Sequence, residues 1–171
     1  MLTKKIIALM VVVVLLAYAC EDDRPSYKTV QDNFFAHQRA FKQIADIVCQ
    51  MGKVKQPYSY TQDEFGYGFE STKAEHRIKN LDALLIQVRM SELRYQKTKS
   101  GQCMVSLQYF VRGFAGSGFK FDYNYQVETP KPYDAKKHSF KQLVDAAKKD
   151  GKDFRFDMPL ADGWYFTFIY T

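Results

Sequence analysis

Apolar residues recur at helical spacing in two stretches of the first half of the chain. One helix face of the first stretch carries Val30, Phe34, Phe41, Ile44, Val48 and Met51, which predicts an amphipathic helix over residues 29–51. Thr29 and Asp32 have the spacing of a helix cap, and Gly52 ends the pattern. The second stretch predicts a helix from about Ser71 to Val88. Residues 53–68, between the two, predict a loop or a short edge strand.

In the second half of the chain, the apolar residues alternate with polar ones. The alternating residues are Cys103, Val105, Leu107, Tyr109 and Val111 in one run, and Phe119, Phe121, Tyr123, Tyr125 and Val127 in the next. Two such runs around the glycine-rich segment 113–118 predict an antiparallel pair of strands with one buried face. Residues 91–97 predict an earlier strand that joins this pair.

The last part of the chain predicts a short helix and two further strands. Phe140, Leu143, Val144 and Ala147 form one helical stripe within residues 139–149. Strands are predicted over residues 154–160 and 164–170, with a turn at residues 161–163. The last strand is apolar on both faces, so we expect it to lie inside the sheet or to be covered on both sides.

Together these elements predict the α+β class. We expect one domain over residues 29–171, in which an antiparallel sheet of about five strands carries two N-terminal helices and one short helix packed on one face. The aromatic residues Phe121, Tyr123, Trp164 and Phe166 should be largely buried.

An uncharged run of 14 residues, from Ile6 to Ala19, precedes the predicted domain. Lys4 and Lys5 lie before this run, and Ala17-Tyr18-Ala19-Cys20 closes it. The run is too short for a transmembrane helix, and the whole segment resembles a bacterial lipoprotein signal peptide. The resemblance implies a signal peptide over residues 1–19, lipidation of Cys20 and a tether over residues 20–28. The alternative is ordinary secretory cleavage after Ala19.

Lipidation implies an address in the cell envelope. By this resemblance, acyl chains such as palmitate would hold the domain at a membrane facing the periplasm. Inner-membrane retention is signalled by aspartate directly after the cysteine, and Glu21 followed by Asp22 departs from that signal. The outer membrane is therefore favoured over the inner one.

With Cys20 used by the anchor, Cys49 and Cys103 are the two remaining cysteines in an oxidising compartment. We expect a disulfide between them that joins the first helix to the sheet. The alternative is two buried free thiols.

The charge balance is mildly basic. The whole chain has a formal net charge of +6, and removal of Lys4 and Lys5 with the signal peptide lowers it to +4. This balance, and the compartment, argue against a nucleic-acid partner. Lys137, Lys141 and Lys148 would lie along one side of the short helix and could bind anionic lipid or an acidic protein. The alternative is that these lysines only keep the surface soluble.

The sequence contains no recognisable catalytic or cofactor motif. His37, His76 and His138 lack the spacing of a metal site and are expected at the solvated surface. The glycines of residues 113–118 lie between two strands and not before a helix, so a hairpin connection or a bulge is favoured over a phosphate-binding loop. We therefore expect no catalytic residue, no metal and no cofactor.

These observations favour a lipid-anchored periplasmic protein-binding module without catalytic activity, similar to immunity or inhibitor lipoproteins. One alternative is a structural or accessory lipoprotein of envelope assembly, and a less favoured one is an envelope-modifying enzyme. The partner would be the membrane, through the anchor, and a protein of the envelope.

Overall fold

The computed structural model describes residues 24–51, 58–61, 78–114, 117–140, 142–143, 145, 149 and 153–171. The helices whose bounds lie within these described residues are α2 (Tyr27–Ala36), α3 (Gln38–Met51) and α4 (Lys79–Val88). Its strands are β1 (Tyr58–Thr61), β2 (Glu92–Lys97), β3 (Cys103–Phe114), β4 (Ser117–Tyr125), β5 (Phe154–Pro159) and β6 (Trp164–Tyr170). The predicted α+β class is confirmed.

The six strands form one antiparallel sheet with the order β1-β2-β3-β4-β6-β5. One strand more is present than predicted, because β1 pairs with the edge of β2. The last strand in chain order, β6, lies between β4 and β5, as its two apolar faces predicted. The two residues between β3 and β4 make these strands a hairpin, as predicted for the glycine-rich segment.

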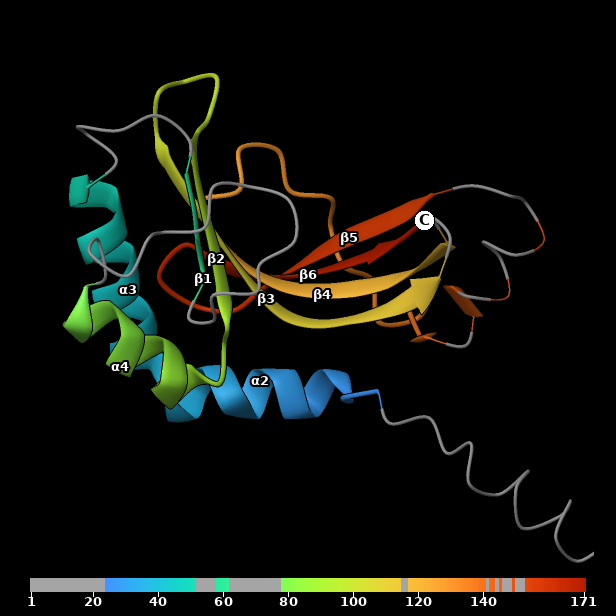
Figure 1. Ribbon diagram of the computed structural model, residues 1–171. Coiled ribbons are helices and arrows are strands. Elements are labelled where there is room, and N and C mark those ends of the chain that lie inside the picture. The colour runs from blue at the N-terminus through green and yellow to red at the C-terminus, as the bar shows by residue number, and fades with distance from the viewer. Residues whose placement is uncertain are drawn as a thin grey trace, which may run out of the picture.

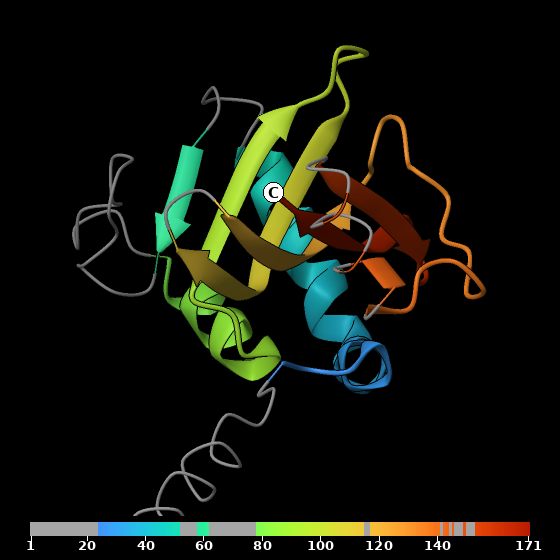
Figure 2. The same ribbon diagram turned by 90° about the vertical axis from the view of Figure 1, so that its right-hand side faces the viewer.

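The helices lie on one side of the sheet (Figures 1 and 2). Phe34 of α2 and Phe41 of α3 contact the rings of Tyr123 and Trp164 on the covered face. Burial of Phe121, Tyr123, Trp164 and Phe166 is confirmed. A continuous aromatic core therefore fixes the first helices against the last strand.

The predicted helix over residues 29–51 is wrong in two details. It begins at Tyr27, capped by the side chain of Ser26 and not by Thr29, so the last two residues of the predicted tether belong to the domain. It is also two helices, which separate at His37. Nδ1 of the His37 ring lies 2.9 Å from the carbonyl oxygen of Asn33, and the backbone N–H of His37 donates to Phe34 instead. This change of partner ends α2, and α3 turns away from it (Figure 1).

The expected burial of Val111 is wrong, because β3 contains a β-bulge between Gln108 and Phe110. One extra residue in a strand exchanges the two faces of all residues after it. Phe110 therefore points into the core and contacts Phe119 and Phe121, whereas Val111 is exposed.

Several described residues within 139–149 are helical, as predicted: Phe140, Gln142, Leu143, Asp145 and Lys149. Phe140 packs against Phe119 and Phe168 at the end of the covered face. The helix predicted over residues 71–88 ends at Val88 as predicted, but its predicted start is wrong. Ile78 has an extended backbone (φ −104°, ψ 98°), and α4 begins after it at Lys79. Residues 71–77 lie outside the described residues.

A disulfide joins Cys49 of α3 to Cys103 at the start of β3, with the Cα atoms 5.6 Å apart. This confirms the predicted pairing. Since the two cysteines are 54 residues apart, the bond fixes one end of α3 to the sheet across a long stretch of chain.

Candidate functional site

The residues proposed from the sequence are only partly described. Cys20, Lys141 and Lys148 lie outside the described residues. Lys137 is exposed, and its Nζ lies 3.6 Å from a carboxylate oxygen of Asp134. The predicted lysine patch therefore stays a prediction. Lys131 and Lys136, close to Lys137 in the sequence, are also exposed.

The two described histidines are half-buried and hydrogen-bonded, which corrects the expectation of solvated surface residues. His37 ends α2, as described above. Nδ1 of His138 accepts a hydrogen bond of 2.9 Å from the backbone N–H of Asp134, and the ring stacks on Phe156. Burial lowers the pKa of His138, which favours the neutral ring that this acceptor role requires. His76 lies outside the described residues.

The sheet face opposite the helices carries a buried polar network. Strand alternation and register place Asn124, Thr167 and Asp157 together on this face. The amide of Asn124 donates to Thr167 Oγ1, and Thr167 Oγ1 donates to Asp157 Oδ1, each at 2.6 Å. Nη2 of Arg155 donates to the same carboxylate oxygen at 3.0 Å. The polar residues at the centre of this face are therefore held in one arrangement.

Asp157 also fixes the segment that follows β4. Its Oδ2 accepts from the backbone N–H of Lys131 at 2.8 Å, and its own N–H donates to the carbonyl of Lys131. Because the Asp157 side chain has no exposed surface, loss of the carboxylate would leave several buried donors without a partner.

Asp122 lies beside this network with one unused acceptor. Nζ of Lys120 contacts its Oδ2 at 2.9 Å, but its buried Oδ1 has no hydrogen-bond partner in the structure. Burial raises the pKa of Asp122, while the charges of Lys120 and Arg94 act against this rise. A carboxylate oxygen in this state can accept a hydrogen bond from a bound group.

These side chains line a cleft of about 410 Å³, here called the sheet cleft, with the cations Arg94, Lys120 and Arg155 and the polar residues Asp122, Asn124 and Thr167. Each cation contacts a carboxylate: Glu92 for Arg94, Asp122 for Lys120 and Asp157 for Arg155. The sheet cleft therefore offers donors and acceptors in about equal measure and no large excess of either charge.

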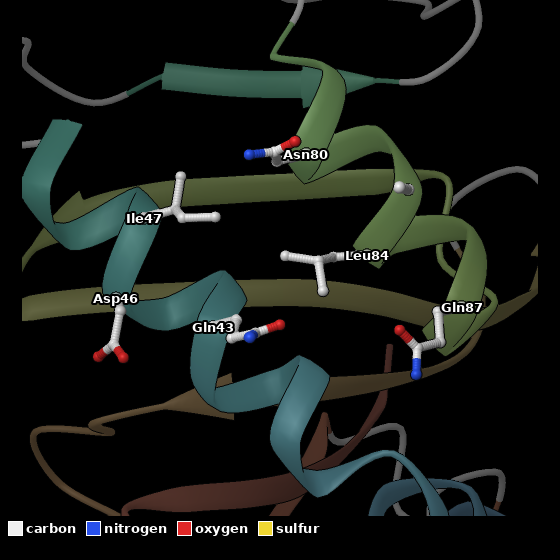
Figure 3. A pocket seen from close by; sticks show the side chains of 7 residues that line it. Gln43, Asp46, Ile47, Asn80, Leu84 and Gln87 are labelled. Carbon is white, nitrogen blue, oxygen red and sulfur yellow. The ribbon is translucent and has the colours of Figure 1, made fainter.

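A second hollow, of about 420 Å³, lies between α3 and α4 on the outside of the molecule. Leu84 and Asn80 of α4 and Gln43 of α3 point into the gap between the helices, whereas Asp46 points away from it (Figure 3). We call this hollow the helix groove. It lacks the charged network that distinguishes the sheet cleft.

Sequence reasoning missed the sheet cleft. The signal present in the sequence was the set of charged and polar residues Lys120, Asp122 and Asn124 at alternate positions of one strand. Their partners on β5 and β6 are more than 30 residues away, and only the strand order brings them together.

The described residues contain no group of three or more metal-binding side chains. Among the described residues, no helix is long and apolar enough to cross a membrane. Comparison of the chain with models of protein families, with curated proteins and with solved structures finds no match.

Proposed function

We propose that this protein is a lipid-anchored protein-binding module of the bacterial envelope, facing the periplasm and without catalytic activity, of the immunity or inhibitor kind. The partner protein binds over the sheet cleft. The signal-like segment that ends at Cys20 supports the anchor, and the resemblance favours the outer membrane.

The observation that carries the binding site is the pre-formed network of the sheet cleft. Its polar and charged side chains are already held by hydrogen bonds and ion pairs of 2.6–3.0 Å. Ordering side chains on binding costs free energy, so side chains that are ordered beforehand favour association. A mixture of both charges gives specificity for a complementary surface rather than general attraction.

Site-specific photo-crosslinking in cells tests where the partner binds. The crosslinking amino acid replaces Gln96 at the sheet cleft, Gln87 at the helix groove or Gln50 on α3, three exposed glutamines. We expect one protein to be crosslinked from position 96 and not from position 50. The combined charge reversals Arg94→Glu and Arg155→Glu should abolish that crosslink.

No crosslink at position 96, or one that survives the charge reversals, would overturn binding at the sheet cleft. A crosslink confined to position 87 would place the partner at the helix groove instead. If the crosslinked protein is a stable subunit of a large envelope complex, the alternative of an assembly or accessory subunit is favoured.

The anchor is tested separately with Cys20→Ser. This variant should lose the acyl chains and be released from the membrane fraction. Unchanged processing and membrane attachment of the variant would exclude lipidation at Cys20.

A further inference from the structure

The first described residues, from Arg24 onwards, pack against the segment that connects β4 to β5. The guanidinium carbon of Arg24 lies 3.4 Å from the centroid of the Phe140 ring, a cation–π contact. Three residues later, the ring of Tyr27 packs against Tyr133 and Phe156. The point where the chain enters the domain is therefore fixed against residues 131–140.

This end of the molecule is rich in lysine. Between Lys131 and Lys152 the sequence has seven lysines and three aspartates. Four of these lysines are described, and all four are exposed: Lys131, Lys136, Lys137 and Lys149. The nearest acidic partner, Asp134, contacts Lys137 at 3.6 Å; Asp145 and Asp153 are also exposed here.

Both views place the start of α2, the start of β5 and the C-terminus at the same end of the molecule (Figures 1 and 2). We call this end, defined by Arg24 and the four exposed lysines, the basic end. The helices α3 and α4 and the β2–β3 turn lie away from it (Figure 1).

We propose that the basic end faces an anionic lipid surface and orients the domain on its membrane. This inference rests on the anchor of the proposed function. Four residue steps separate Cys20 from Arg24, a reach of at most about 14 Å. Charges within about one Debye length, ~8 Å, of a membrane are attracted by anionic head groups.

The tether adds no attraction of its own, because Glu21, Asp22 and Asp23 are acidic. The lysines of the domain must supply it. With the basic end on the lipid, α3, α4 and the β2–β3 turn lie away from the membrane (Figure 1). The helix groove and the part of the sheet cleft formed by Arg94 and Gln96 of β2 then stay accessible to a protein in the periplasm.

Lysine acetylation followed by mass spectrometry tests this orientation. The full-length lipidated protein is reconstituted into vesicles of phosphatidylcholine, with or without phosphatidylglycerol. We expect Lys131, Lys136, Lys137 and Lys149 to be acetylated roughly fivefold more slowly in the anionic vesicles, and this protection to fade at high salt. Lys97 and Lys99, in the β2–β3 turn, serve as internal references and should react equally in both.

Matched variants distinguish an effect of the basic end from an effect of the protein's overall positive charge. The triple variant Lys131→Gln, Lys136→Gln and Lys137→Gln should lose the protection of Lys149, whereas Lys42→Gln, Lys97→Gln and Lys99→Gln together should retain it. If the protein attaches to both kinds of vesicle and its lysines are acetylated at equal rates in both, the proposed orientation is wrong but the anchor stands. Failure to attach to either vesicle would overturn the anchor, and the orientation with it.

Discussion

Two tyrosines with buried hydroxyl groups should respond in opposite ways to loss of the hydroxyl. The Tyr123 hydroxyl donates to the carbonyl of Val30 at 2.7 Å, whereas the buried Tyr27 hydroxyl has no partner in the structure. An unsatisfied buried polar group costs about 1–3 kcal/mol, and a satisfied one contributes about 1 kcal/mol. We expect Tyr27→Phe to raise the free energy of unfolding by about 1 kcal/mol and Tyr123→Phe to lower it by about 1 kcal/mol.

Urea denaturation of the two variants, followed by circular dichroism, measures these changes. Both substitutions remove the same atom, so each is the control of the other. A loss of stability in Tyr27→Phe would show that its hydroxyl has a hydrogen-bond partner in solution.

Asp122 should make stability depend on pH in a way that Asp122→Asn removes. Its folded-state pKa is raised above the usual 3.8, chiefly by burial, so the folded protein binds this proton more tightly than the unfolded chain. The contribution of Asp122 to the free energy of unfolding therefore falls as pH rises through the raised pKa. We expect Asp122→Asn to be more stable than wild type at pH 7 and to lose this advantage below the ordinary carboxyl range.

Thermal denaturation of both proteins from pH 3 to pH 8 measures this difference. Asp32→Asn, at an exposed i,i+4 pair with Lys28, is the matched control. A difference between wild type and Asp122→Asn that does not change with pH would refute the role of burial.

At the residue scale, the alternation in β4 correctly predicts the burial of Phe121 and Tyr123, but it does not predict that Asp122 and Asn124 on the opposite face are also buried. The alternation fails to predict the exposure of Val111, because no residue type in β3 indicates a bulge. The break between α2 and α3 at His37 could not be predicted either, because it depends on a histidine ring that competes for one backbone carbonyl.

Among the elements, α3 and β3 are joined by the disulfide between Cys49 and Cys103. In the chain-entropy model, closing a loop of this length stabilises the fold by up to ~4 kcal/mol. The double variant Cys49→Ser and Cys103→Ser should lose stability of this order while keeping its secondary structure. Denaturation with and without reductant checks it, because reductant should destabilise the wild type and leave the variant unchanged.

The β3–β4 hairpin depends on a close approach of its two strands at Gly118. A Cβ at this position would lie against the backbone of Arg112 and 2.6 Å from the Cα of Gly113, closer than real side chains allow. Backbone atoms cannot move aside as a flexible side chain can. We therefore expect Gly118→Ala to lower the free energy of unfolding by about 1–3 kcal/mol.

The same substitution at Gly101 is the control, because a Cβ there meets nothing within 4 Å, although its positive φ of 81° adds some backbone strain. If Gly118→Ala costs no more than Gly101→Ala, the close approach is not present in solution.

Most elements could be predicted from the sequence because periodicity is a local property. The strands 92–97 and 164–170 and the end of α4 at Val88 agree with the prediction. The edge strand β1 remained undecided between loop and strand, because its four residues are too few to establish a period. Its pairing with β2 gives it the strand conformation.

At the scale of the whole molecule, the disulfide could be predicted and the sheet cleft could not. With Cys20 assigned to the predicted anchor and an oxidising compartment expected, counting cysteines leaves a single pair. The sheet cleft, by contrast, combines residues of β2, β3, β4, β5 and β6, and its geometry follows from the strand order β4-β6-β5. Nothing in local spacing specifies that order.

The position of β6 also sets when the domain can form. Tyr27, at the start of α2, packs on Phe166 of β6, and β5 joins the sheet only through β6. A chain that leaves an export channel with its N-terminus first must keep its aromatic residues uncovered until the last strand has emerged. A chain stopped after Leu160 should therefore remain sensitive to protease, whereas the full chain becomes resistant. If the protein is exported as proposed, its aromatic residues would thus stay uncovered for nearly the whole time of its passage.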